Sequence, residues 1–266
     1  MQNNSVYNNV TQWQLLLLAI SFLTRIPVKL RFDVSTAHLN QASRYFAFVG
    51  LLLGGLLALS YGVFQLLFPP SISILLMMAI GLLLTGAFHE DGWADVWDGF
   101  GGGWQVEQKL AIMKDSRLGT YGAAALFIIL LIKFQSLLFL SESLSSVLSA
   151  ILLGQCLSRM VATSLIMSMD YVSEDATSKV KPLAMHLSVT SLTILLLTAA
   201  ALLAGLILLG IISWQSALII SAVLLLLRLI LISWFKRQLG GYTGDCLGAA
   251  QQLSEIAIYL TLVSLL

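Results

Sequence analysis

Residues 88–103, FHEDGWADVWDGFGGG, gather four acids and a histidine between His89 and Asp98 in a chain that is otherwise mostly apolar. On a helix, Asp91, Asp95 and Asp98 stand at positions i, i+4 and i+7, so their carboxylates share one side. Carboxylates held this close repel one another unless a cation lies among them. Oxygen ligands suit a hard ion such as Mg²⁺, which commonly joins one or two protein carboxylates to substrate phosphates. The stretch therefore predicts a magnesium site for phosphate chemistry.

Glycines accompany the aspartates. Gly92 and Gly99 follow the first and last members of the trio, and GFGGG ends the segment at residue 103. Glycine lets a backbone approach a bulky group where a side chain would obstruct it, so we interpret these glycines as room for a ligand. His89 has three open interpretations: a base, a phosphate contact or a structural residue at a helix end. The alternative for the whole stretch is a capped helix end with scattered acids.

A second polar segment, MKDSRLGTYG at 113–122, brings Lys114 and Arg117 around Asp115 and Ser116. Arginine offers a planar fork for two phosphate oxygens and lysine offers a point charge, so the segment favours an anionic ligand. The alternative is a basic membrane anchor followed by a capped helix start.

A third polar segment is the glycine-rich GGYTGD at 240–245, where Thr243 and Asp245 are candidates to bind an ion or sugar hydroxyls. Three further basic residues, Lys133, Arg159 and Arg228, fall inside apolar runs. Charges within a membrane are costly, so each is expected to face a polar cavity, form a structural pair or extend to the membrane surface.

The composition decides what kind of scaffold must position these groups. Of 266 residues, 58% are hydrophobic and only 10% are charged, far below the charged fraction of soluble domains. The chain is therefore expected to be a single integral-membrane domain over residues 1–266. A net charge of +1 gives no reason to expect nucleic acid as a partner.

Seven apolar runs are long enough to span a bilayer as helices, since lipid leaves backbone polar groups no other partners. They are 46–68, 71–88, 121–140, 144–169, 187–212, 214–235 and 247–266. The run at 13–24 is too short to span and is expected to be an interfacial or re-entrant helix before Pro27. The fold class is therefore all-α: a polytopic transmembrane helix bundle of about seven spans plus that short N-terminal helix.

Charge predicts the orientation of the bundle. The long connections between runs hold most of the 14 basic residues, including Lys179 and Lys181, and the short turns hold none. By the positive-inside tendency, the long connections are cytoplasmic and the C-terminus is outside. The three polar segments all belong to the cytoplasmic side.

Taken together, the motifs resemble the cobalamin synthases, or adenosylcobinamide-GDP ribazoletransferases. The resemblance rests on FLTRIP (22–27), HEDGWADVWDG (89–99), MKDSRLGTYG (113–122), SR (158–159) and GGYTGDCLGA (240–249), followed by Glu255. These motifs run from end to end of the chain in the family's order. Trp93 and Trp97 depart from the smaller or aliphatic residues of the family pattern, which puts fine substrate contacts in doubt.

The resemblance implies a Mg²⁺-dependent transferase of the inner membrane with a cytoplasmic active site. The ribose 3′-hydroxyl of α-ribazole, or of its 5′-phosphate, attacks the phosphorus that carries the cobinamide in adenosylcobinamide-GDP, and GMP leaves. The implied metal ligands are Asp91, Asp95, Asp98 and Asp245. The implied catalytic residues are His89, Asp91, Asp95, Asp98, Asp115 and Arg117. The implied substrate-binding residues are Arg25, Lys114, Ser116, Arg159, Gly241, Thr243 and Glu255.

Other functions remain open from the residues alone. The CDP-alcohol phosphotransferases open a similar metal motif with D-G-x-x-A, but here Ala94 comes one position early. A corrinoid transporter would place acids near the bilayer midplane, whereas this chain places them at one rim. A membrane scaffold would not need the aspartates. Gly54 and Gly55 are candidates for a helix contact in a homo-oligomer such as a dimer.

Overall fold

The computed structural model describes residues 10–172 and 184–266, and its regular secondary structure there is helical apart from one isolated bridge between Tyr171 and Tyr242. The all-α expectation is thus confirmed. The expected positions of Lys179 and Lys181 fall outside the described residues.

The helices follow the apolar runs closely. In chain order they are α1 (Gln12–Leu23), α2 (Thr36–Ala42), the 3-10 turn η1 (Ser43–Tyr45), α3 (Phe46–Gln65), α4 (Pro70–Thr85), α5 (Phe88–Gly102), α6 (Val106–Lys114), α7 (Thr120–Leu140), α8 (Leu144–Ser164), the 3-10 turn η2 (Leu165–Met167), α9 (Val189–Leu208), α10 (Trp214–Leu239) and α11 (Gly244–Ser264).

The number of spans agrees with the expectation. Six helical stretches in the described part are long and apolar enough to cross a membrane, and a seventh span arises if α4 and α5 count as one broken span. The chain is therefore a multi-pass membrane protein. Helix α1, with 12 residues, is too short to span, as expected.

The acidic helix is not a continuation of the second span, which corrects the expected run at 71–88. Helix α4 ends at Thr85, and α5 leaves it at an angle of 86°. Gly86 and Ala87 both adopt left-handed backbone angles, with φ of 67° and 56°, and an alanine in this conformation is not foreseeable from sequence. Helix α4 holds the apolar part of this stretch, and α5, which carries the acidic residues, runs nearly at right angles to it.

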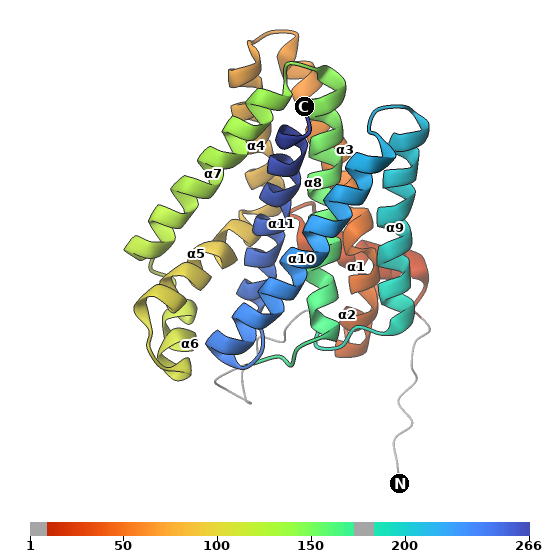
Figure 1. Cartoon of the computed structure of the whole chain (residues 1–266). Helices are drawn as coiled ribbons and strands as arrows, with labels where there is room; N and C mark the ends of the chain where they lie inside the picture. Colours follow the sequence, from red (N-terminus) through yellow and green to blue (C-terminus); the bar gives the residue numbers. More distant parts are fainter. Residues whose placement is uncertain (1–9, 173–183) are drawn as a thin grey trace.

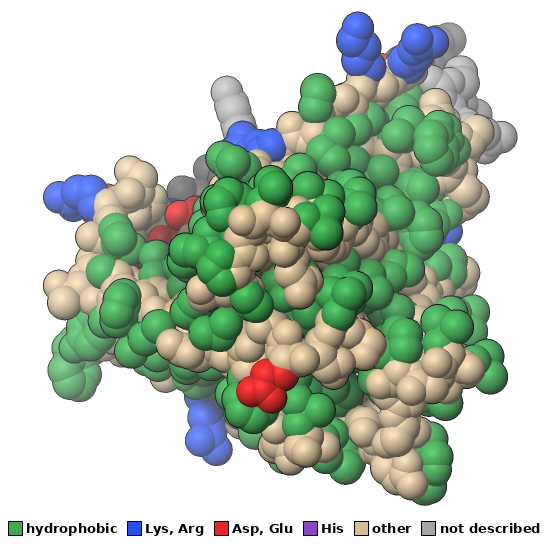
Figure 2. All heavy atoms as spheres, turned by 90° about the horizontal axis from the view of Figure 1, so that it is seen from above, with side chains coloured by type: hydrophobic (Ala, Val, Ile, Leu, Met, Phe, Trp, Pro, Cys, Tyr) green, Lys and Arg blue, Asp and Glu red, His purple; other side chains and the backbone are tan. Residues whose placement is uncertain are grey.

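The two ends of the bundle differ in character. The short turns and the C-terminus lie at one end, while α5, α6 and the longer connections lie at the other (Figure 1). Seen from the end that holds the C-terminus, most of the surface is hydrophobic or uncharged, an acidic group lies near the middle, and Lys and Arg side chains lie mainly at the rim (Figure 2). The polar segments therefore share an end, as expected, while the assignment of that end to the cytoplasm stays a prediction.

Helices α8 and α11 form the centre of the bundle. In their most apolar windows, 83% of α8 and 72% of α11 is buried, against 22% for α9 and α10, which leaves the latter pair to face lipid. A Cβ on Gly54 would lie 3.1 Å from Leu152 Cα of α8, so Gly54 serves packing within the chain. Gly55 faces open space, and the expected homo-oligomer stays a prediction.

Candidate active site

Helices α5 and α11 cross at two glycines. A Cβ on Gly92 would lie 2.9 Å from Asp245 Cα, and one on Gly248 would lie 3.2 Å from His89 O. A Cβ on Gly99 would lie 2.5 Å from Met113 Cγ of α6. These glycines bring helices together, which corrects the interpretation that Gly92 and Gly99 make room for a ligand.

The crossing creates an acidic cluster of Asp91, Asp95, Asp98 and Asp245. Asp91 is exposed, whereas Asp95 is half-buried. Burial, followed by the charges of Asp245, Asp91 and Asp98, raises the pKa of Asp95 from 3.8 to about 7. The trio therefore does share a side of α5, and Asp245 of α11, also among the expected metal ligands, lies close to it.

Asp98 differs from its neighbours because it is buried and its carboxylate binds backbone amides. Its carboxylate accepts hydrogen bonds from Gly119 N at 2.7 Å and from Gly122 N at 2.8 Å. Asp98 thereby fixes the start of α7 against α5. Both of its oxygens are engaged by amides that lie more than 20 residues away in the sequence.

The acidic cluster lacks a preformed metal geometry. Within residues 10–172 and 184–266, no three His, Cys, Asp or Glu side chains converge as a complete metal site would require. The ion pairs between two described residues include Arg117–Asp115, Lys133–Glu90 and Lys133–Glu255, and none of these three involves a member of the cluster. The cluster is a concentration of negative charge with oxygen donors.

A cavity of about 520 Å³ lies beside the cluster. Its wall comes from α1, α3, α5, α6, the end of α8, residues 171–172 and the start of α11. Asp245 belongs both to this wall and to the acidic cluster. The cavity has the volume of a site for one small organic ligand, and Asp245 connects it with the carboxylates of α5.

The polar wall contains several of the expected residues. His89, Lys114, Arg159 and Thr243 all line the cavity, so the structure brings four segments of the sequence together. Arg159 is only 3% exposed, and its Nη1 donates to Gln155 Oε1 at 2.8 Å, while its Nε has no hydrogen-bond partner in the described part. A buried guanidinium with an unused donor is suited to an anionic ligand.

Thr243 and Gly241 position the segment that carries Asp245. The Thr243 hydroxyl accepts from Cys246 N and caps α11. A Cβ on Gly241 would lie 2.2 Å from Asp170 O, so this glycine permits the backbone pairing with residues 170–172. Gly241 does not line the cavity and contributes through that pairing.

Four other expected site residues lie outside the cavity wall. Arg117 has 87% of its side chain exposed and pairs with Asp115, its Nε donating to Asp115 Oδ2 at 3.0 Å. Hydrogen bonds from Arg117 lower the pKa of Asp115. Ser116 and Arg25 are exposed, and Arg25 covers the α4–α5 bend at Gly86. The structure places this group at the surface, outside the cavity wall.

Glu255 lies outside the cavity wall, in a polar network that adjoins the cavity through Gln251 and Arg159. Its carboxylate accepts from Lys133 Nζ at 3.1 Å, Gln155 Nε2 at 2.8 Å, Gln251 Nε2 at 3.0 Å and Tyr259 OH at 2.8 Å. Sequence reasoning placed Glu255 at the substrate, whereas the structure shows it buried and occupied by the chain itself. The contacts span about a hundred residues of sequence, which explains why spacing did not reveal them.

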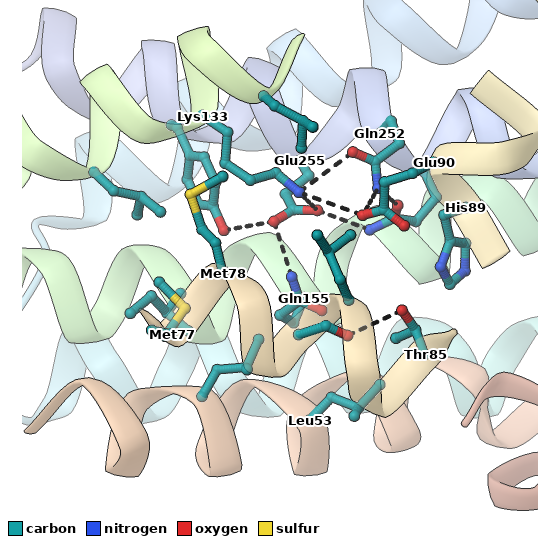
Figure 3. A pocket seen from close by; sticks show the side chains of 18 of the residues that line it. Leu53, Met77, Met78, Thr85, His89, Glu90, Lys133, Gln155, Gln252 and Glu255 are labelled. Carbon is teal, nitrogen blue, oxygen red and sulfur yellow. Dashed lines mark hydrogen bonds and ion pairs between the residues drawn. The ribbon is translucent and has the colours of Figure 1, made fainter. Parts of the chain in front are cut away.

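This network also includes Glu90 and Gln252, which sequence reasoning missed. The side chains of Lys133, Glu255, Glu90 and Gln252 point toward one another around a small cavity of about 40 Å³ (Figure 3). Gln252 Nε2 donates to Glu90 Oε1 at 3.1 Å. We call Lys133, Glu255, Glu90, Gln155, Gln251 and Gln252 the inner network. The feature of the sequence that could have revealed this network is the presence of polar side chains, such as Lys133 and Gln252, within apolar runs.

Two open questions from the sequence are answered by packing. Trp93 and Trp97 pack against each other, with ring centroids 5.4 Å apart, and neither lines the large cavity. Their departure from the family pattern thus concerns helix packing. Arg228 donates to Ser164 Oγ at 2.8 Å and forms a structural contact between α10 and α8.

The comparisons with known proteins point to one activity. Residues 15–263 match the family described as cobalamin-5-phosphate synthase. An adenosylcobinamide-GDP ribazoletransferase of Shewanella piezotolerans is 53% identical, with 95% of each chain covered. The protein of that name from Vibrio cholerae is 51% identical over 96% of this chain and 95% of its own. No solved structure matches.

Proposed function

The chain belongs to the cobalamin-5-phosphate synthase family, and on that premise we propose how its cavity and acidic cluster perform the ribazole transfer. The reaction moves the adenosylcobinamide phosphoryl group from adenosylcobinamide-GDP to the ribose 3′-hydroxyl of α-ribazole or its 5′-phosphate. GMP leaves, and adenosylcobalamin or its 5′-phosphate forms. The protein is a transferase of cobalamin biosynthesis.

The observation that carries the assignment of the site is the position of Asp245. It lines the cavity of about 520 Å³ and faces the carboxylates of α5. A nucleoside in the cavity would thus have its ribose hydroxyls beside the part of the molecule where negative charge is concentrated. Donor and acceptor substrates would meet at the crossing of α5 and α11.

The acidic cluster fits Mg²⁺ in charge and donor type. Burial, together with repulsion from the neighbouring carboxylates, raises the pKa of Asp95 to about 7, and a bound cation would relieve the repulsion. Mg²⁺ usually takes one or two carboxylates together with substrate phosphates and waters, so a complete protein cage is not required. We assign Asp91, Asp95 and Asp245 to the ion, with Asp98 completing the set or orienting α5.

When bound, Mg²⁺ would neutralise charge that develops on the diphosphate oxygens. The chain's own residues then position the reactants. Arg159 and Lys114 bind phosphate oxygens from the cavity wall. Arg117, on the exposed loop, leaves its ion pair with Asp115 and binds a phosphate oxygen from the solvent side of the site. His89 and Asp245 are the candidates to accept the proton of the attacking hydroxyl, since both line the cavity that would receive it.

The remaining assignments concern the surroundings. We place the end with α5 and α6 in the cytoplasm and the C-terminus outside the inner membrane, because the long connections carry the basic residues. Ser116 and Arg25 would contribute at the mouth of the site, where both are exposed.

One assay tests the proposal against a transporter and a scaffold. Purified protein in detergent, freed of metal with EDTA, receives adenosylcobinamide-GDP and α-ribazole with and without Mg²⁺, and GMP release is followed. We expect GMP only when Mg²⁺ is present. Substrate binding without GMP release would favour a scaffold. Corrinoid flux without turnover, measured with the same protein reconstituted into vesicles, would favour a transporter. Equal turnover after complete metal removal would refute the metal assignment.

A further inference from the structure

The wall of the large cavity contains an apolar part and a polar part. On the side of α1, α3 and α5, Phe22 lies edge-on to Phe88 at 5.3 Å and stacks with Phe46 at 6.1 Å. Ala162 on α8 and Ile166 in η2 complete an apolar surface. A planar aromatic ring gains both burial and ring contacts against such a wall.

Polar groups border this apolar wall at His89, which follows Phe88, and at Thr163, which follows Ala162, and they lie farther from its other members. Arg159 and Ile166 lie seven residues apart on the same stretch of α8 and η2, which separates them by about 10 Å. Lys114 and Asp245 come from the ends of α6 and α11. The side chains contributed by α1 and α3 are Phe22, Leu23 and Phe46, and these have no hydrogen-bonding groups. A ligand in the cavity would have polar contacts for its ribose and phosphate but an apolar surface for its ring.

The volume separates the two substrates. A cavity of about 520 Å³ suits one small organic molecule, such as a nucleoside. A corrin macrocycle with its amide side chains is larger and polar around its rim, so it does not match this wall. The acceptor nucleoside therefore fits the cavity, whereas the corrin part of the donor does not.

We propose that the apolar wall formed by Phe22, Phe46, Phe88, Ala162 and Ile166 binds the base of the acceptor nucleoside and selects an alkylated benzimidazole over a purine. The inference rests on the proposed function and identifies the part of the site that sets base specificity. The ring nitrogens and amino group of a purine would lose their hydrogen bonds to water against this wall and gain none. The methyl groups of dimethylbenzimidazole would be buried there.

The test compares kcat/KM of the purified enzyme for three acceptors: α-ribazole with its dimethylbenzimidazole, the same nucleoside with unsubstituted benzimidazole, and the same nucleoside with adenine. For the unaltered enzyme we expect kcat/KM to fall in that order. Each lost methyl contact and each unpaired polar group is expected to cost about ten-fold or more. Equal values for dimethylbenzimidazole and adenine would overturn the inference.

Two substitutions locate the effect. Ala162→Leu narrows the cavity and should lower kcat/KM for the dimethylbenzimidazole substrate about ten-fold, with a smaller loss for unsubstituted benzimidazole. Ile166→Ala should reduce the preference for the methylated base. Met167→Ala is the matched control, because Met167 is adjacent in sequence, exposed and absent from the cavity wall.

The outcomes separate this inference from the proposed function. If Ala162→Leu and Ile166→Ala lower kcat/KM equally for all three acceptors, as a general loss of stability would, the base assignment is wrong while the transferase stands. The same holds if Met167→Ala alters base preference as much as Ile166→Ala does. If the unaltered enzyme releases no GMP with any acceptor, the proposed function itself fails and the inference falls with it.

Discussion

Two clusters of charged side chains lie within this apolar chain, the inner network and the acidic cluster, and they differ in how their charges are compensated. The inner network pairs Glu255 with Lys133 at 3.1 Å and satisfies the carboxylate with further hydrogen bonds. The acidic cluster gathers Asp91, Asp95 and Asp245 with no ion pair in the described residues to offset them. A charged group that is already neutralised holds the fold together, whereas one left uncompensated is available to a ligand.

The largest effect should come from removing a cluster carboxylate. Asp91→Ala and Asp95→Ala should each lower GMP release by about a hundred-fold or more, because a phosphate-bound metal ion supplies several kcal/mol of charge stabilisation. The melting temperature in detergent should stay within a few degrees of the unaltered protein, which separates lost chemistry from lost folding. Near-normal turnover by both variants would remove the metal assignment.

Breaking the inner network should lower the stability of the folded protein. Lys133→Met leaves the buried Glu255 charge without its cation and should destabilise the protein by about 3–5 kcal/mol, as judged by thermal melting. Combining it with Glu255→Gln should restore part of that loss, since Glu255 is then uncharged and only Glu90, 3.9 Å from Lys133 Nζ in the unaltered protein, lacks its cation. If the double variant is less stable than Lys133→Met alone, the pair is not the source of the effect.

The crossing of α5 and α11 connects the cluster with the cavity. Gly92→Ala places a Cβ 2.9 Å from Asp245 Cα and should force the helices apart, with a cost of about 1–3 kcal/mol and a loss of turnover up to about a hundred-fold. Gly55→Ala is the control, because no atom lies within 4 Å of its Cβ. Equal behaviour of the two variants would show that the close approach does not matter for catalysis.

The raised pKa of Asp95 predicts how the metal requirement depends on pH. Since its pKa is about 7, the carboxyl binds a proton below that value and the proton competes with Mg²⁺. The Mg²⁺ concentration for half-maximal GMP release should fall by up to about ten-fold as pH rises from 6 to 8, with most of the change below pH 7. A half-maximal concentration that stays constant from pH 6 to 8 would contradict this competition.

The smallest effect concerns stability without metal. A raised folded pKa makes Asp95 destabilising once pH exceeds its unfolded value near 4, and this penalty grows until about pH 7. Asp95→Asn should therefore stabilise the metal-free protein at pH 8, by about 1 kcal/mol or less because the group is half-exposed and screened. At pH 4 the melting temperatures should coincide, and a destabilised Asn variant at pH 8 would argue against repulsion in the cluster.

The sequence predicted the parts that local pattern controls. Apolar run lengths located the spans, and the i, i+4, i+7 spacing correctly placed Asp91, Asp95 and Asp98 on one side of a helix. It could not predict the bend before α5, because Ala87 is not a residue type that marks a left-handed backbone. It also could not assign Asp98 to the amides of α7, since that contact depends on how distant helices pack.

Glu255 shows the same limit at the site. Motif resemblance identified it as a functional residue, but only the packing of α7, α8 and α11 reveals that Lys133, Gln155 and Gln251 occupy its carboxylate. Conversely, Asp245 ends the glycine-rich segment GGYTGD, which on its own is only weak evidence for a binding site. Its importance comes from the position of α11 against α5, which Gly92 and Gly248 make possible.

The most direct test of the central claim is a titration of metal-free protein with Mn²⁺, followed by electron paramagnetic resonance, in the presence of adenosylcobinamide-GDP. We expect saturable binding that Asp91→Asn and Asp95→Asn weaken strongly, while Glu107→Gln, an exposed acid on α6, leaves it unchanged. Binding of equal strength in all four proteins would contradict a cation held by the acidic cluster.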